Sequence, residues 1–231
     1  IDGSSYLFRA YHALPPLTNS KGVPTGAVYG FTKMLLKIIR DERPEAMVVV
    51  FDSAGPTDRH KRFADYKANR EQMPDDLSRQ LPYIHRVVEA MRIPILIQQG
   101  QEADDLIGSL ARQAAAQDFQ VTIATSDKDM LQLVGPEIRV YDWMKEKVYD
   151  EPEVLKRFGV PPDQVVEVMG LMGDPIDNIP GVHGIGEKTA RSLIQQFGSI
   201  EEMITRLHEI KSARVREILR RQVEQARLSR D

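Results

Sequence analysis

The chain has 231 residues and no cysteine, which excludes disulfides, thiolate zinc sites and cysteine nucleophiles. Its hydrophobic residues (42%) and charged residues (28%) are typical of a soluble globular protein, and no apolar run is long enough for a membrane span or a signal peptide. The lack of cysteine is compatible with a cytosolic compartment, and we expect no membrane partner. With 34 acidic and 31 basic residues, the net charge of −3 argues mildly against a nucleic-acid partner.

Short β-branched runs alternate with helical hydrophobic spacing in the first 150 residues. The runs at 47–52, 93–97 and 121–124 have the pattern of strands buried on both faces of a parallel sheet. Amphipathic helices are predicted around residues 28–38, 77–91 and 107–114, and Pro82 should kink the second of them. This alternation predicts an α/β fold in which a mostly parallel central sheet is flanked by helices.

Strand signals stop near residue 150, where short helical pieces separated by prolines begin. We therefore expect two parts, an α/β core over residues 1–150 and a helical region over residues 151–231. The chain begins at Ile1 rather than at Met. Because Asp2 would stand at the carboxyl end of a strand, we expect the body of a first strand to precede Ile1.

Nine acidic residues stand at the ends of predicted strands or beside turns. Each cluster alone has a simpler explanation, such as a turn or a helix cap. In an open α/β sheet, however, the loops at the carboxyl ends of the strands converge on one edge, where so many carboxylates would repel one another unless divalent cations neutralised them. Such oxygen ligands suit Mg²⁺ or Mn²⁺, and two of these ions can support phosphodiester hydrolysis. The nine residues are Asp2, Asp52, Glu102, Asp104, Asp105, Asp127, Asp129, Asp174 and Asp177.

A glycine-rich stretch over residues 177–190 carries Gly181, Gly184 and Gly186, followed by Lys188. Glycines permit tight turns and bring backbone N–H groups close to a phosphate, and a helix that begins near Lys188 favours anions at its N-terminus. A structural turn with a glycine cap would also explain these glycines. The flanking apolar residues at helical spacing favour a helix-hairpin-helix that binds the DNA backbone without sequence preference.

Residues 57–70 are too polar to form core, which predicts an exposed, partly helical excursion from the sheet. A solvated charged face is the ordinary explanation for its basic residues. Close after a predicted metal ligand, however, Arg59, Lys67 and Arg70 would also suit a clamp on a nucleic-acid strand. Tyr66 fits two roles equally, since it could stack on a base or anchor the excursion to the sheet.

Taken together, these motifs resemble the 5′-nuclease domain of bacterial DNA polymerase I, which belongs to the flap endonuclease family. The resemblance covers nearly the whole chain in the same order and with similar gaps. It rests on residues 1–12, 24–27, 49–52, 66–70, 73–77, 102–105, 126–130 and 171–190.

The resemblance implies a nuclease core, a helical arch over about residues 57–85 and a C-terminal helical region that carries the hairpin. It also implies a K⁺ ion held by backbone oxygens near the loop at residues 181–186. In this family one metal ion is held by the positions that match Asp2, Asp52, Glu102, Asp104 and Asp105. The second is held by the positions that match Asp127, Asp129, Asp174 and Asp177. The positions that match Arg9, Arg59, Tyr66, Lys67 and Arg70 engage the scissile phosphate and the 5′ strand, and Lys67 and Arg70 are the expected catalytic pair.

We therefore expect a structure-specific 5′-nuclease that uses two Mg²⁺ (or Mn²⁺) ions to cut 5′ flaps and junctions. Its expected substrates are flap or junction DNA and RNA primer–DNA hybrids in replication and repair. The resemblance further implies a monomer of the bacterial cytoplasm, close to the nucleoid, with a polymerase domain as an expected partner in a longer chain. Two alternatives stay open, a non-catalytic DNA-junction binding module and a PIN-type ribonuclease.

Some positions depart from the family pattern. Relatives commonly have prolines where this chain has Glu71 and Gln72, and a lysine-bearing stretch where it has Ala54 to Pro56. The lower positive charge weakens the expectation of substrate threading, but not that of the chemistry. His183 replaces a common proline in the hairpin and could contact a phosphate when protonated.

The net charge hides an uneven distribution. Setting aside the nine predicted metal ligands leaves 25 acidic residues against 31 basic ones, a balance of +6. The remaining surface is therefore basic enough to bind a phosphate backbone, and the initial argument against nucleic acid loses its weight.

Overall fold

The computed structural model describes residues 1–70 and 72–231, so the departure at Glu71 lies outside the described residues. The chain divides into two compact units. The first unit comprises Ile1–Asp58, Glu71–Asp127 and Val140–Lys147, and the second comprises Arg59–Arg70, Lys128–Arg139 and Val148–Asp231.

Parallel strands form the centre of the first unit. β1 (Val49–Val50) pairs in parallel with β2 (Ile95–Leu96), and both are shorter than their β-branched runs. Asp2 forms a parallel bridge with Val50, and its N–H donates to the carbonyl of Ala124 at the end of β3 (Val121–Ala124) over 3.0 Å. The start of the chain therefore runs between β1 and β3.

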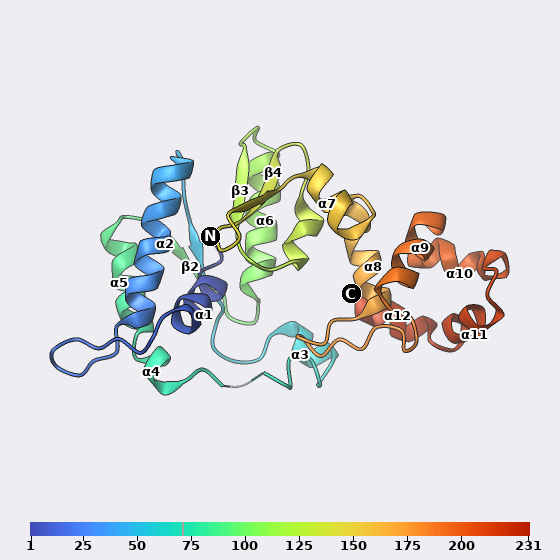
Figure 1. The fold of residues 1–231 in the computed structure, drawn as a ribbon, viewed down its shortest axis with the longest axis horizontal. Helices are drawn as coiled ribbons and strands as arrows, with labels where there is room; N and C mark the ends of the chain where they lie inside the picture. The colour runs from blue at the N-terminus through green and yellow to red at the C-terminus, as the bar shows by residue number, and fades with distance from the viewer. Residues whose placement is uncertain (71) are drawn as a thin grey trace. The chain divides into compact units, whose positions relative to one another are not determined.

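Helices cover this sheet, which confirms the predicted α/β class. Aromatic and aliphatic side chains of α1, α2 and α5 pack with β1 into one buried cluster that includes Phe31, Leu35, Ile84 and Phe51. α6 contacts β1 and β3 outside that cluster. The helices of this unit are α1 (Gly3–Ala13), α2 (Gly26–Glu42), α4 (Asp75–Ser78), α5 (Leu81–Ala90) and α6 (Ala103–Ala115), and Figure 1 shows α2 and α5 side by side.

Pro82 has a different effect from the expected kink. The apolar pattern over residues 77–91 is divided into two helices, and Pro82 lies in the first turn of α5. A proline costs no hydrogen bond there because the N–H groups of a first turn have no partner within the helix.

The second unit is mainly helical. Short helices follow the last strand, in agreement with the loss of strand signals near residue 150. Its elements are α3 (Asp58–Arg62, which begins in the first unit), η1 (Asp129–Leu133), α7 (Glu151–Phe158), η2 (Pro162–Gln164), α8 (Val165–Met172), α9 (Glu187–Phe197), α10 (Ile200–Thr205), η3 (Leu207–Glu209), α11 (Ala213–Arg221) and α12 (Val223–Arg230). β4 (Ile138–Asp142) and β5 (Lys147–Tyr149) contain residues of both units and form a three-stranded sheet with β3 in the order β3-β4-β5, separate from the two-stranded sheet of β1 and β2.

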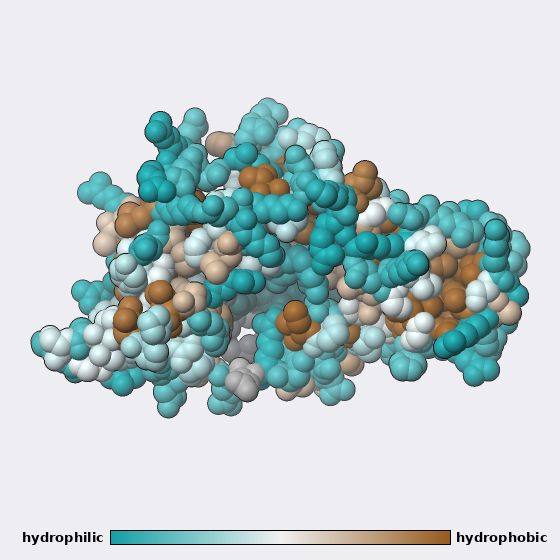
Figure 2. Space-filling model, in the orientation of Figure 1, coloured by the Kyte–Doolittle hydropathy of each residue, from teal (hydrophilic) through white to brown (hydrophobic). Residues whose placement is uncertain are grey.

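Hydrophilic side chains cover most of the face drawn in Figure 2. Hydrophobic side chains are visible among α9, α10 and α11. Among the helices of the described residues, none has the length and apolar character needed to cross a bilayer.

Candidate metal centre and nucleic-acid interface

Asp2 is a buried acid of the first unit, with 4% of its surface exposed. It is the N-cap of α1, where one carboxylate oxygen accepts from the N–H of Ser5 (2.8 Å). The other oxygen accepts from the hydroxyl of Thr125 (2.7 Å), directly after β3. The same hydroxyl accepts from the N–H of Asp127 (3.0 Å), so Thr125 links the surroundings of two predicted metal ligands.

Asp52 and the 102–105 cluster meet at the start of α6. The Asp52 carboxylate accepts from the N–H of Ala103 (2.8 Å), so it lies at the positive end of the helix. Glu102 is buried, accepts from the Thr57 hydroxyl (3.3 Å) and forms a capping box with Asp105. The helix cap is therefore the structural reason that these acids lie together, and Asp104 lies in the same first turn.

The charges of this group influence one another. Burial, mainly, raises the pKa of Asp2 from 3.8 to about 6, and the negative charges of Asp52 and Asp127 raise it further against the lowering effect of the Thr125 and Ser5 hydrogen bonds. Asp2, Asp52 and Asp127 therefore form a set of interacting carboxylates. A hard divalent cation suits such oxygen donors. In the described part of the chain, however, no three His, Asp or Glu side chains are already arranged closely enough to hold a metal ion.

Two predicted metal ligands of the second unit have basic partners. Asp174, which is 5% exposed, forms an ion pair of 2.9 Å with the Lys128 ammonium. Asp177, which is 7% exposed, is paired with the Arg70 guanidinium, and the Lys67 ammonium lies 3.7 Å away. Side-chain cations thus neutralise these two buried carboxylates. Asp129, the third predicted metal ligand of this unit, begins η1.

The basic excursion contributes a buried tyrosine. Tyr66 is 6% exposed, its ring packs edge-on against His60, and its hydroxyl lies 3.5 Å from the Asp177 carboxylate. These contacts hold Tyr66 within the second unit, and its two expected roles stay predictions. Arg59 lies in α3, and Arg9 is exposed on α1 in the first unit, where it donates to the Ser126 hydroxyl next to Asp127.

The predicted hairpin lies between α8 and α9. Gly181 has φ of 61°, and a Cβ there would come within 2.3 Å of the Gly173 nitrogen, so glycine is required for close backbone packing. Gly184, Gly186 and Lys188 are exposed, and Lys188 lies in the first turn of α9. The structure therefore places the exposed loop glycines and Lys188 together at the start of α9, where Glu187 also lies in the first turn.

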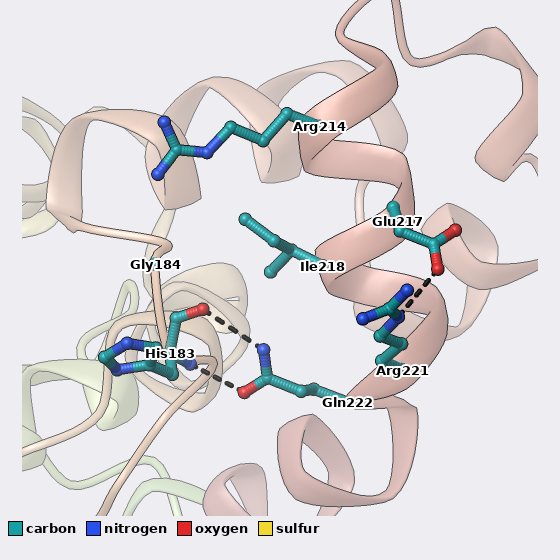
Figure 3. A pocket seen from close by; sticks show the side chains of 7 residues that line it. All are labelled: His183, Gly184, Arg214, Glu217, Ile218, Arg221 and Gln222. Carbon is teal, nitrogen blue, oxygen red and sulfur yellow. Dashed lines mark hydrogen bonds and ion pairs between the residues drawn. The ribbon is translucent and has the colours of Figure 1, made fainter.

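Beside the hairpin lies a pocket of about 450 Å³ that the sequence motifs did not indicate (Figure 3). Gln222 fixes the hairpin loop, since its amide accepts from the N–H of His183 (2.8 Å) and donates to its carbonyl (3.1 Å). The basic run near the C-terminus was the only sequence signal for this pocket. It was not sufficient, because nothing local in the run shows that α11 faces the hairpin. The pocket is lined by His183, Gly184, Arg214, Glu217, Ile218, Arg221 and Gln222.

Two family models match the chain end to end. The N-terminal resolvase-like domain of 5′-3′ exonuclease matches residues 1–159, and the C-terminal SAM fold of 5′-3′ exonuclease matches residues 160–231. A 5′-3′ exonuclease of Aquifex aeolicus is 44% identical over 204 residues, which are 88% of this chain and 71% of that protein. The chain belongs to the 5′-3′ exonuclease family.

Relatives within longer proteins are equally similar. DNA polymerase I of Bacillus caldotenax is 46% identical over 235 residues, which cover this whole chain and 27% of that protein. DNA polymerase I of Rhizobium leguminosarum is 43% identical over 239 residues, 24% of its length. The chain thus spans about a quarter of these polymerases.

Solved structures support the fold. A bacteriophage T5 flap endonuclease, described as a pseudo-enzyme-product complex with DNA and metal ions, has a TM-score of 0.82 at 21% identity over 99% of this chain and 85% of that one. The catalytic core of Rad2 with a DNA substrate has a TM-score of 0.61 at 17% identity over 97% of this chain and 71% of that one. At this level of identity, both comparisons concern the fold alone.

Proposed function

We propose that the chain is a structure-specific 5′-nuclease that hydrolyses phosphodiesters of DNA or RNA at 5′ flaps and junctions. Its membership of the 5′-3′ exonuclease family over the whole length supports the reaction class. The single structural observation that carries the proposal is the burial of Asp2 close to Asp52 and Asp127, because buried carboxylates that lie near one another favour a divalent cation as their partner.

The proposed metal ligands fall into two sets. Hard-cation chemistry fits all nine carboxylates, and bound Mg²⁺ or Mn²⁺ would activate water and stabilise the leaving oxygen. The chain's own residues would bind and orient the strand, with Lys67 and Arg70 on the scissile phosphate and Arg9, Arg59 and the hairpin on the rest of the DNA backbone. The sets are Asp2, Asp52, Glu102, Asp104 and Asp105 for the first ion, and Asp127, Asp129, Asp174 and Asp177 for the second.

The same proposal extends to partners and setting. The solved neighbours include a complex with DNA and metal ions and a complex with a DNA substrate, which supports a nucleic-acid substrate here. We infer that RNA primer–DNA hybrids are cut as well, that K⁺ binds at the 181–186 loop, and that the chain acts as a monomer in the bacterial cytoplasm. The polymerase relatives support a polymerase domain as a partner in a longer chain.

A flap-cleavage assay tests this function. A 5′-labelled flap duplex is incubated with the chain in Mg²⁺ and, in parallel, in EDTA, with single-stranded RNA as a second substrate. We expect cleavage at the junction in Mg²⁺ and none in EDTA. Binding without cleavage in Mg²⁺ would instead identify a junction-binding module, and cleavage of the RNA alone would identify a ribonuclease.

A further inference from the structure

Two segments of the second unit are joined by bonds that do not involve carboxylates. They are the basic segment, residues 65–70, and the acidic loop, residues 174–178. The Asn69 side chain donates to the carbonyl of Pro175 (2.9 Å). The Asn178 side chain donates to the carbonyl of Asp65 (2.7 Å). One asparagine from each segment thus crosses to the backbone of the other.

A third bond lies between these two. The backbone N–H of Lys67 donates to the carbonyl of Asp177 over 2.9 Å. Lys67 has φ of 54° and Asn178 has φ of 57°, a left-handed conformation that is rare for lysine and more acceptable for asparagine. A lysine persists there only where its surroundings hold it. The crossed asparagine bonds provide such surroundings.

The backbone arrangement determines where the basic groups lie. The Lys67 ammonium lies 4.8 Å from the centre of the buried Tyr66 ring and 3.7 Å from the Asp177 carboxylate. Arg70 pairs with the same carboxylate. Both cations are therefore gathered beside one predicted metal ligand, on a segment attached to that ligand's own loop.

We propose that Asn69 and Asn178 are positioning residues, which hold Lys67 and Arg70 of the basic segment in place beside the acidic loop. The proposal rests on the proposed nuclease function. A cation that binds Asp177 would compete with Lys67 and Arg70 for its carboxylate. The asparagine bonds end on carbonyl groups, so they persist through that exchange and keep the two basic groups within reach of the substrate phosphate.

Two variants test this role with a matched control. Asn178→Gly removes the side-chain bond and keeps the left-handed backbone accessible, and Asn69→Ala removes the other bond. Asn19→Ala is the control. The side chain of Asn19 also forms hydrogen bonds with the backbone, but it does so in a local turn of the first unit. Loss of either hydrogen bond should slow flap cleavage by about five- to tenfold.

Hydrogen exchange of the Lys67 amide in metal-free protein is the first measurement. We expect both asparagine variants to speed this exchange and Asn19→Ala to leave it unchanged. The second measurement is single-turnover flap cleavage at saturating DNA, where the asparagine variants should be about five- to tenfold slower than the unaltered chain. Their binding to the flap in EDTA should be unchanged, because positioning affects the reacting geometry more than the affinity.

A double-mutant cycle separates positioning from general destabilisation. In a Lys67→Ala, Arg70→Ala background, the asparagine substitutions should slow cleavage little further, since their effect passes through those two side chains. Equal losses in both backgrounds, or unchanged amide exchange at Lys67, would overturn the positioning role. An unaltered chain that leaves the flap uncut in Mg²⁺ would instead overturn the proposed function itself.

Discussion

Asp2 has opposing effects on the stability of the folded chain. Its two oxygens cap α1 and accept from Thr125, which favours the folded chain. Its burial beside Asp52 and Asp127 disfavours the ionised form. A residue that weakens the metal-free fold at neutral pH is expected where cation binding has been favoured over stability.

The substitution Asp2→Asn should stabilise the metal-free chain at pH 7. The folded pKa of Asp2, about 6, lies above its ordinary 3.8, so the folded state holds this proton more tightly and loses stability as the pH rises from about 4 to about 6. Removing the charge should therefore raise the free energy of unfolding at pH 7 by about 1–3 kcal/mol, and by little at pH 4.

Denaturant unfolding in EDTA at the two pH values measures this difference. Asp163→Asn is the matched control, because Asp163 is exposed to solvent. A lower stability of Asp2→Asn at pH 7 would contradict the account.

At the scale of residues, the sequence indicated which acids would lie near one another, but not which basic side chains would form ion pairs with them. The position of Asp2, Asp52 and Glu102 at strand ends or helix starts is a local pattern, and it indicated which residues would lie near one another. The partner of Asp177 was not predictable, since Arg70 is 107 residues away and only the folded chain brings the two together. The buried position of Tyr66 depends on the same long-range contact.

At the scale of elements, the hairpin needs glycine at position 181 and is held by helices that are distant in the sequence. Gly181 packs on Gly173 at the end of α8, and its N–H donates to the Ser229 hydroxyl of α12 (3.2 Å). Glycine spacing predicted the turn. The contribution of α11 and α12 was not predictable, because a basic amphipathic run does not reveal which loop it will contact.

Gly181→Ala should destabilise the chain by about 2 kcal/mol or more. The added Cβ would meet the Gly173 backbone at 2.3 Å in a left-handed conformation that alanine disfavours. Gly186→Ala is the matched control, since a Cβ there meets no atom within 4 Å and the residue already has φ of −91°. Thermal unfolding of the two variants should separate them, and equal melting temperatures would show that the close packing at Gly181 is not needed.

At the scale of the whole molecule, the charge distribution is more informative than its sum. The chain carries −3 overall, yet nine of its acids belong to the predicted metal centre and the rest of the chain is basic. Such a distribution lets one protein attract both divalent cations and a phosphate backbone.

Divalent cations should therefore stabilise the chain. Ligands that bind only the folded state raise the free energy of unfolding, by about 2–3 kcal/mol at a hundredfold excess over Kd. We expect the melting temperature to rise on addition of Mg²⁺, to return with EDTA, and to rise less in Asp2→Asn. A melting temperature that does not respond to Mg²⁺ or Mn²⁺ would contradict the proposed metal centre.

Cleavage of a 5′-flap duplex by Asp127→Ala in Mg²⁺ tests the central claim most directly, with the exposed Asp163→Ala as control. We predict cleavage at least about 10²-fold slower than that of the unaltered chain, with flap binding in EDTA and the melting temperature in EDTA retained. Asp163→Ala should cut normally. Cleavage by Asp127→Ala at the rate of the unaltered chain would contradict the assignment of the acidic residues to metal-dependent hydrolysis.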